Sequence, residues 1–191
     1  MADKFKKITS DLYRYKSLTG LKGFIFAYFA FNGFRVTFWF RITQYIQSTR
    51  LPRIVKRVFV FILLRQQSST GVELNPGTEI GPGLYIPHGG GIVISPSSQI
   101  GSNCYISHGV TIGKVHTGPR EGTPTLCDDV FLGPGVKVLG NLTIYRNAAV
   151  GANSVVLDDV PRDSFAAGMP ARVVAARGAS EIIGSDIYEN H

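Results

Sequence analysis

The chain has 191 residues, a length typical of one core domain or of two small ones. Its hydrophobic content of 44% is ordinary for a globular protein, and two cysteines are too few for a disulfide framework. Charge is uneven: residues 1–69 carry thirteen Lys or Arg against two Asp, whereas the remainder carries seven against eleven Asp or Glu. No nucleic-acid recognition motif accompanies the basic part, so nucleic acid is not an expected partner.

The basic N-terminal part is predicted to be helical. It opens with a polar segment that lacks the apolar core of a signal peptide, so we expect a cytoplasmic location. Residues 20–47 are predicted to form one helix or two, and residues 52–67 another. The aromatic stretch 24–40 contains Asn32 and Arg35 and is shorter than the roughly twenty residues of a membrane span.

Two interpretations of these basic, aromatic helices remain open. In the first, they lie as a peripheral element on the inner face of the cytoplasmic membrane, with cations against anionic lipid. The cations concerned are Lys4, Lys6, Lys7, Arg50, Arg53, Lys56 and Arg57. In the second, the aromatic side chains pack as a cap over one end of the domain that follows.

A branched aliphatic residue recurs every six positions through most of the next eighty residues. The series is Leu74, Ile80, Ile86, Ile94, Ile100, Ile106, Ile112, Leu126, Leu132, Val138, Ile144, Val150 and Val156. A small or apolar residue recurs two positions before most of them. A period of six fits neither a helix nor an antiparallel strand and is typical of a β-helix. Three six-residue sides close one coil of roughly eighteen residues.

The period slips twice, and each slip marks a departure from the regular coil. Eight positions separate Ile86 from Ile94, and fourteen separate Ile112 from Leu126. The second interval, residues 113–125, lacks the inward aliphatic pattern, so we expect a loop extruded from the coil. Loops carried by a rigid scaffold often hold binding groups.

The repeat resembles that of the hexapeptide-repeat acyltransferases, which implies a left-handed parallel β-helix. We therefore predict a mainly β protein with a helical segment at 1–69, a β-helix at 70–160 and a C-terminal segment at 161–191. From Ala179 onward the chain is polar, and we expect a weakly ordered tail. The string at 168–172, Gly-Met-Pro-Ala-Arg, is similar to the closing segment of acetyl-CoA-dependent members, which implies acetyl-CoA as co-substrate and no metal.

Two histidines are the candidate catalytic groups. His88 and His108 each stand two residues after an inward aliphatic residue, and they are twenty positions apart. That distance is one coil plus the two-residue slip, so we expect both on the same side of adjacent coils. Histidine titrates near working pH and suits a base that takes the hydroxyl proton during acyl transfer. Backbone N–H groups of Gly109, Gly113 and the extruded loop are candidate oxyanion donors.

Residues 19–176 resemble the serine acetyltransferase family, and more closely its polysaccharide branch, such as the colanic acid O-acetyltransferases. The resemblance implies His88 as the base and Glu73, where the family has Asp, as its carboxylate partner. It implies acceptor contacts from His108, Asn75 and Thr123. Expected CoA contacts come from Gly113, Gly133, Gly135, Gly151, Ala152, Pro170 and Arg172.

Two departures from the serine enzymes bear on the acceptor. The family's substrate Asp is Pro87 here, and its Arg-His pair in the loop corresponds to Gly122-Thr123. Those groups would bind the charges of an amino acid, so we expect a sugar hydroxyl of a polysaccharide or its lipid-linked precursor. Serine O-acetyltransferase is the alternative.

Two further classes of function are less favoured. One is a zinc enzyme of the carbonic anhydrase type, with His88, His108 and His116 as ligands. The other is a non-catalytic scaffold. The resemblance also implies a homotrimer with active sites between subunits, and closed cyclic assemblies are common among such proteins.

Overall fold

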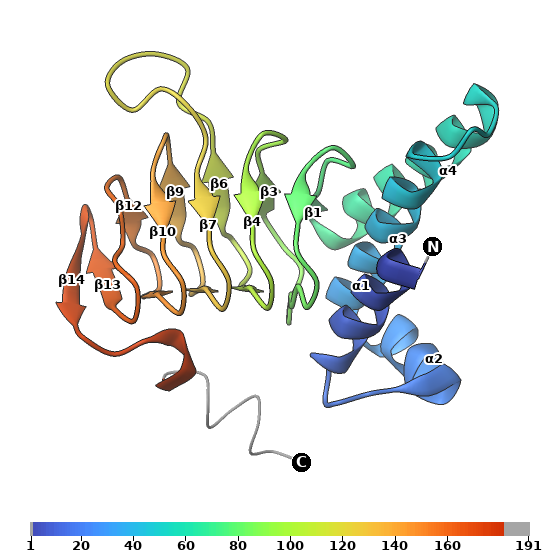
Figure 1. Cartoon of the computed structure of the whole chain (residues 1–191), viewed down its shortest axis with the longest axis horizontal. Helices are drawn as coiled ribbons and strands as arrows, with labels where there is room; N and C mark the ends of the chain where they lie inside the picture. The colour runs from blue at the N-terminus through green and yellow to red at the C-terminus, as the bar shows by residue number, and fades with distance from the viewer. Residues whose placement is uncertain (1, 182–191) are drawn as a thin grey trace.

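The computed structural model describes residues 2–181, with side chains from Lys6 onward. Figure 1 shows the helices α1 to α4 gathered at one end of a β-helix. The helices are α1 (Ala2–Tyr13), α2 (Gly20–Ala30), α3 (Asn32–Gln47) and α4 (Arg53–Thr70). The range 20–47 thus forms two helices, which break at Phe31, where the backbone is extended. Most of the tail predicted from Ala179 lies outside the described residues.

Local chemistry explains where α4 begins and ends. Pro52 precedes its first residue, a position that tolerates proline because the first N–H groups of a helix have no partner within it. Gly71 follows its last residue in the left-handed conformation, with φ of 64°, and donates its N–H to the Gln67 carbonyl at 2.8 Å. The chain then enters the first coil at Val72.

Fourteen strands follow among the described residues. The coil strands are β1 (Val72–Glu73), β2 (Glu79–Ile80), β3 (Ile92–Ile94), β4 (Gln99–Ile100), β5 (Tyr105–Ile106), β6 (Thr111–Gly113), β7 (Thr125–Leu126), β8 (Phe131–Leu132), β9 (Lys137–Leu139), β10 (Thr143–Ile144), β11 (Ala149–Val150) and β12 (Val155–Val156). A closing hairpin consists of β13 (Phe165–Gly168) and β14 (Ala171–Ala175).

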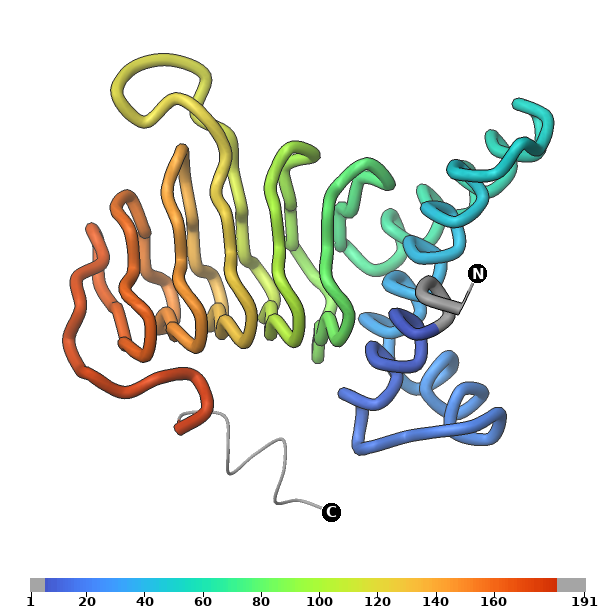
Figure 2. The backbone as a smooth tube through the Cα atoms, in the orientation of Figure 1, coloured from blue at the N-terminus to red at the C-terminus, as the bar shows by residue number. Residues whose placement is uncertain are grey.

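The strands form three sheets that run the length of the coil (Figure 2). Their orders are β1-β3-β6-β9-β12, β10-β7-β4-β2 and β14-β13-β11-β8-β5, and all pairs except β13 with β14 are parallel. Each sheet therefore takes one strand from each successive coil. The predicted left-handed parallel β-helix with an N-terminal helical segment is confirmed.

The six-residue period defines the core. Each aliphatic member from Leu74 to Val156 is at most 4% exposed. The small or apolar residues two positions earlier are buried as well: Thr78, Leu84, Ser98, Cys104, Val110, Val130, Val136, Leu142, Ala148 and Ser154. In register, Ile94 pairs with Ile112 and Val138 with Val156, so like residues stack from coil to coil. A long loop leaves the coil between β6 and β7 (Figures 1 and 2).

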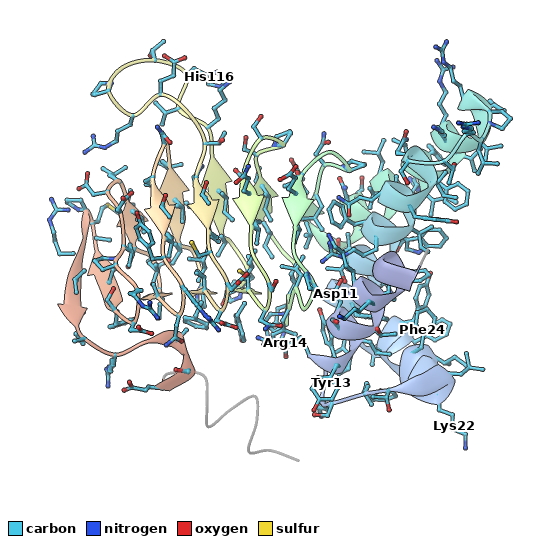
Figure 3. The ribbon with its side chains drawn as sticks, viewed as in Figure 1. Asp11, Tyr13, Arg14, Lys22, Phe24 and His116 are labelled. Atoms are coloured by element: carbon cyan, nitrogen blue, oxygen red, sulfur yellow. The ribbon has the colours of Figure 1, made fainter. Side chains whose placement is uncertain are left out.

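A buried ion pair attaches the helices to the first coil. The Arg41 guanidinium donates to the Asp11 carboxylate at 2.9 Å and to the carbonyls of Ile80 at 2.8 Å and Gly81 at 2.6 Å. Asp11 also accepts the Leu84 N–H at 2.9 Å. Figure 3 labels Asp11 where α1 faces the coil. The guanidinium thereby satisfies carbonyls at the open end of the β-helix, which have no coil above them.

The cap interpretation accounts for part of the aromatic content. Phe34 and Phe40 are fully buried, and the Tyr15 hydroxyl donates to the Ile86 carbonyl at 2.9 Å. A Cβ on Gly33 would lie 1.8 Å from that same Ile86 oxygen, so α3 approaches the coil closely only because residue 33 is glycine. Other aromatic side chains of α2 and α4 remain exposed.

Candidate active site

His88 and His108 occupy one corner of adjacent coils, as their spacing predicts. Their ring centroids are 6.5 Å apart with planes inclined at 69°, and both side chains are exposed. Three residues before the histidines, Tyr85 and Tyr105 form a parallel β-bridge. This bridge aligns the two coils so that His88 and His108 become neighbours. Two imidazoles therefore face solvent side by side, within reach of one small substrate.

The same corner continues along the β-helix as a line of small residues. The Gly135 N–H donates to the His108 carbonyl at 2.9 Å, which places the segment 133–135 directly after His108. The Asn153 N–H donates to the Pro134 carbonyl at 2.8 Å, which places the segment 151–153 after that. Four predicted CoA contacts lie in these two segments: Gly133, Gly135, Gly151 and Ala152.

Glycine is required at one position of this corner. Gly135 has φ of 75°, a conformation that other residues resist, and a Cβ there would lie 2.2 Å from Asn153 Oδ1. The Asn153 side chain therefore packs directly against the Gly135 backbone, in space that a side chain at position 135 would need.

The remaining predicted binding residues lie elsewhere. Gly113 ends β6 at the base of the extruded loop, and Thr123 Oγ1 donates to the Ser97 carbonyl at 3.0 Å near the end of that loop. Arg172 lies on β14 and donates to Asp158 at 3.3 Å, whereas Pro170 lies in the turn that precedes this strand. The structure thus divides the predicted CoA contacts between the histidine corner and a second region around the loop and the closing hairpin.

Glu73 and Asn75 belong to the first coil. Glu73 is exposed on β1 and lines a hollow of about 470 Å³ together with Gly91, which ends the His88 corner. Within the described part of this single chain, no hydrogen bond or ion pair joins Glu73 to His88. Asn75 Oδ1 accepts the Gly77 N–H at 2.8 Å, so one of its acceptor positions is occupied by a turn. The catalytic pairing of Glu73 and His88 stays a prediction.

One predicted oxyanion donor is wrong. The Gly109 N–H donates to the Gly90 carbonyl at 2.7 Å, because the corner uses this bond to join two coils. The loop backbone is also partly used, since Val115 and Gly122 exchange N–H···O bonds of 3.0 Å in both directions.

Arg120 is a residue of the loop that the sequence analysis did not single out. Its guanidinium donates to the Leu157 carbonyl at 2.8 Å and to the Asp158 carboxylate at 3.2 Å, and Asp158 also accepts from Arg172. Arg120 thus fastens the loop to the closing segment. The sequence offers one indication of this contact: the loop contains a single arginine, and the acidic pair Asp158-Asp159 follows later in the chain.

Other reactive groups do not gather near the histidines. Figure 3 shows His116 on the extruded loop, and no group of three or more His, Cys, Asp or Glu side chains suited to a metal occurs in residues 2–181. Burial raises the pKa of the Cys104 thiol to about 12, so this cysteine is a poor nucleophile.

Comparisons with curated proteins and with solved structures point to the same kind of protein. No model of a known protein family matches the chain. It is 39% identical over 150 residues to the serine acetyltransferase of Synechococcus elongatus, covering 78% of this chain and 59% of that protein. It is 43% identical over 131 residues to the enzyme of Bacillus subtilis, covering 65% and 59%. The chain therefore spans about three fifths of the length of these curated relatives.

Solved structures extend the similarity to nearly the whole chain. The Neisseria gonorrhoeae serine acetyltransferase in complex with serine is 30% identical, with a TM-score of 0.75, over 91% of this chain and 70% of that one. A serine acetyltransferase in complex with CoA is 28% identical, with a TM-score of 0.74, over the same shares.

These findings overturn the expected sugar acceptor, whether polysaccharide or lipid-linked, and the placement in the polysaccharide branch. The similar proteins are serine acetyltransferases. The prediction was wrong because it rested on the absence of charged groups at Pro87 and Gly122-Thr123. Such an absence at three positions does not exclude charged groups elsewhere in the same loop, which carries Lys114, His116 and Arg120.

Proposed function

Because this chain belongs to the serine acetyltransferase family, we propose that it transfers the acetyl group of acetyl-CoA to the hydroxyl of serine. The observation that carries the proposal is the exposed pair His88 and His108 at the head of a corner that continues through the segments 133–135 and 151–153. This arrangement provides a proton acceptor beside a surface on which a thioester can lie. The proposal makes acetyl-CoA a co-substrate and needs no metal.

The reaction proceeds directly between the two bound substrates. His88 removes the proton of the serine hydroxyl while that oxygen attacks the thioester carbonyl. The tetrahedral intermediate then expels the CoA thiolate, and the His88 imidazolium donates its proton to the thiolate sulfur. The products are O-acetylserine and CoA. No enzyme nucleophile takes part, which agrees with the burial of the Cys104 thiol.

The proposal assigns supporting roles to the other predicted site residues. His108 neighbours His88 and binds the acceptor, whereas Glu73 fixes the tautomer of His88. The backbone at Gly133, Gly135, Gly151 and Ala152 receives the extended part of CoA. The closing hairpin, with Pro170 and Arg172, lies beyond it and binds the rest of the tail.

We infer that the extruded loop recognises the charges of serine. Lys114 and His116 are exposed on this loop; the Lys114 ammonium supplies positive charge for the carboxylate, and the His116 ring supplies an N–H donor. They replace the Arg-His pair that the family resemblance places at Gly122-Thr123. Asn75 and Thr123 complete the acceptor side, and a homotrimer brings a neighbouring subunit next to each loop.

The experiment compares three acceptors with acetyl-CoA and purified protein. L-serine should release CoA thiol and yield O-acetylserine by mass spectrometry. Glycine has the same charges without the hydroxyl, and N-acetylglucosamine has hydroxyls without the charges, so neither should yield an acetylated product. The proposal fails if serine releases no more CoA than glycine does.

A further inference from the structure

The helical region 20–70 contains eight Lys or Arg and no Asp or Glu. Among the described residues, Arg41 is the one cation of this range in an ion pair, and its partner Asp11 comes from α1. Residues 20–70 contain no carboxylate that could pair with the other seven positive charges. This part of the surface therefore has a positive potential that no carboxylate of residues 20–70 neutralises.

Large apolar side chains are exposed on α4 beside these charges. Their exposed fractions are 67% for Ile54, 50% for Val58, 64% for Phe61 and 52% for Leu64. Positions spaced by four and three residues lie on one side of a helix, so the four form a continuous stripe, here called the α4 stripe. A hollow of about 310 Å³ beside it is lined by Gln47, Arg53, Lys56, Arg57, Val60, Phe61 and Leu64.

A second apolar surface lies on α2. Leu21, Ile25, Phe26 and Phe29 are 75%, 50%, 55% and 76% exposed. Figure 3 shows Lys22 projecting from this helix away from the rest of the molecule. Both helices lie at the end of the β-helix opposite the closing hairpin (Figure 1). Exposed patches of this kind mark binding surfaces.

The two candidate partners for these apolar surfaces are a second copy of this chain and an anionic bilayer, and the charge of the helices distinguishes them. A second copy bound through the same helices would place cations against cations, with no carboxylate in residues 20–70 to pair with them. The headgroups of an anionic bilayer supply that missing negative charge, and its interface accepts shallowly buried Phe and Ile. Within residues 2–181, every helix falls short of the length and hydropathy of a membrane span.

We propose that α2 and the α4 stripe bind the surface of a bilayer that contains anionic phospholipid. The interaction is independent of acetyl transfer and adds a partner to the proposed enzyme. Arg53 and Arg57 are exposed next to the stripe and face the headgroups. Lys7, which the sequence analysis counted among the membrane cations, does not: its ammonium donates to the Ile80 carbonyl at 2.9 Å. The Lys4 side chain lies outside the described residues.

The test is flotation of the full chain with vesicles. Vesicles of phosphatidylglycerol mixed with phosphatidylcholine should carry the protein upward at low salt and much less at high salt, which screens the headgroups. Pure phosphatidylcholine vesicles should carry little. Protein that stays at the bottom of the gradient with the mixed vesicles at low salt overturns the proposal.

Variants with matched controls locate the surface. Arg53→Gln with Arg57→Gln should lower partitioning about 30-fold, since each cation near an anionic surface contributes about a fivefold factor. Arg146→Gln with Arg162→Gln removes the same charge from the β-helix and should change nothing. Phe61→Ser should lower partitioning roughly tenfold or more.

Tyr145→Ser removes an exposed aromatic side chain of the β-helix, 44% exposed, and should leave flotation unchanged. Equal losses in the helical variants and their controls would overturn the assignment of the surface. A second outcome would also overturn it: the wild type does not bind vesicles, and sedimentation shows that Phe61→Ser dissociates an oligomer. The stripe would then be an interface between copies of the chain.

Discussion

His88 and His108 are the same side chain in two neighbouring turns of one repeat, and substitution separates their roles. His88→Ala should lower kcat by about 10²–10⁴ with little change in the KM for acetyl-CoA, because a general base contributes to that extent. Steady-state kinetics with serine measure the effect. The mutated site lies on the surface, so the fold should be unaffected.

The matched variant is His108→Ala, which should raise the KM for serine more than it lowers kcat. Both residues are exposed and lie 6.5 Å apart, so each variant controls for loss of an imidazole at the corner. Near full turnover in His88→Ala, together with an inactive His108→Ala, would mean that the two roles are reversed.

The buried Cys104 thiol makes the stability of the folded chain depend on pH. Burial raises the pKa of its thiol to about 12, whereas an unfolded cysteine titrates near 8.5. The folded state therefore holds a proton that the unfolded state releases, so stability falls as pH rises from about 9 toward 12. Urea unfolding across this range should show the decline, and Cys104→Ala should reduce it. An identical dependence of stability on pH in Cys104→Ala would show that the Cys104 thiol does not cause the decline.

At the level of elements, the Asp11–Arg41 pair joins α1 and α3 to the first coil. Both side chains are at most 2% exposed. Arg41→Ala leaves the buried Asp11 carboxylate without its charged partner and the Gly81 carbonyl without this donor, and we expect a loss of about 3–5 kcal/mol in the free energy of unfolding. Arg146→Ala, which breaks the exposed pair with Asp129, should cost at most about 1 kcal/mol. Similar losses in urea unfolding would contradict this.

The extruded loop depends on one arginine for its position. Arg120→Ala removes the bonds to the Leu157 carbonyl and the Asp158 carboxylate. The pair is roughly half exposed, so global stability should change by less than about 1 kcal/mol. Amide exchange in residues 114–122 should become faster, and the KM for serine should rise. Unchanged exchange in the loop would show that Arg120 does not position it.

For the whole molecule, we expect a homotrimer. The parallel sheets expose side chains along flat faces, such as Val93 at 40%, and such faces favour packing against copies of the chain. Light scattering at micromolar concentration should give three times the mass of one chain. A monomer under these conditions would contradict both the trimer and a site that includes a neighbouring subunit.

The sequence by itself determined the β-helix, its core, its extruded loop and the register of the two histidines. Each of these depends on a period of six, and a solenoid converts that period directly into position, because every coil repeats the one before it. Residues twenty apart, such as His88 and His108, become neighbours without any knowledge of distant packing.

The tertiary structure decided what the repeat does not encode. The helices obey no such period, so the Asp11–Arg41 pair, the approach of Gly33 to Ile86 and the inward turn of Lys7 could not be predicted. The division of the predicted CoA contacts between two regions and the use of the Gly109 N–H likewise depend on which coil edges meet. Contacts between segments far apart in sequence arise from three-dimensional packing, and a local pattern carries no information about them.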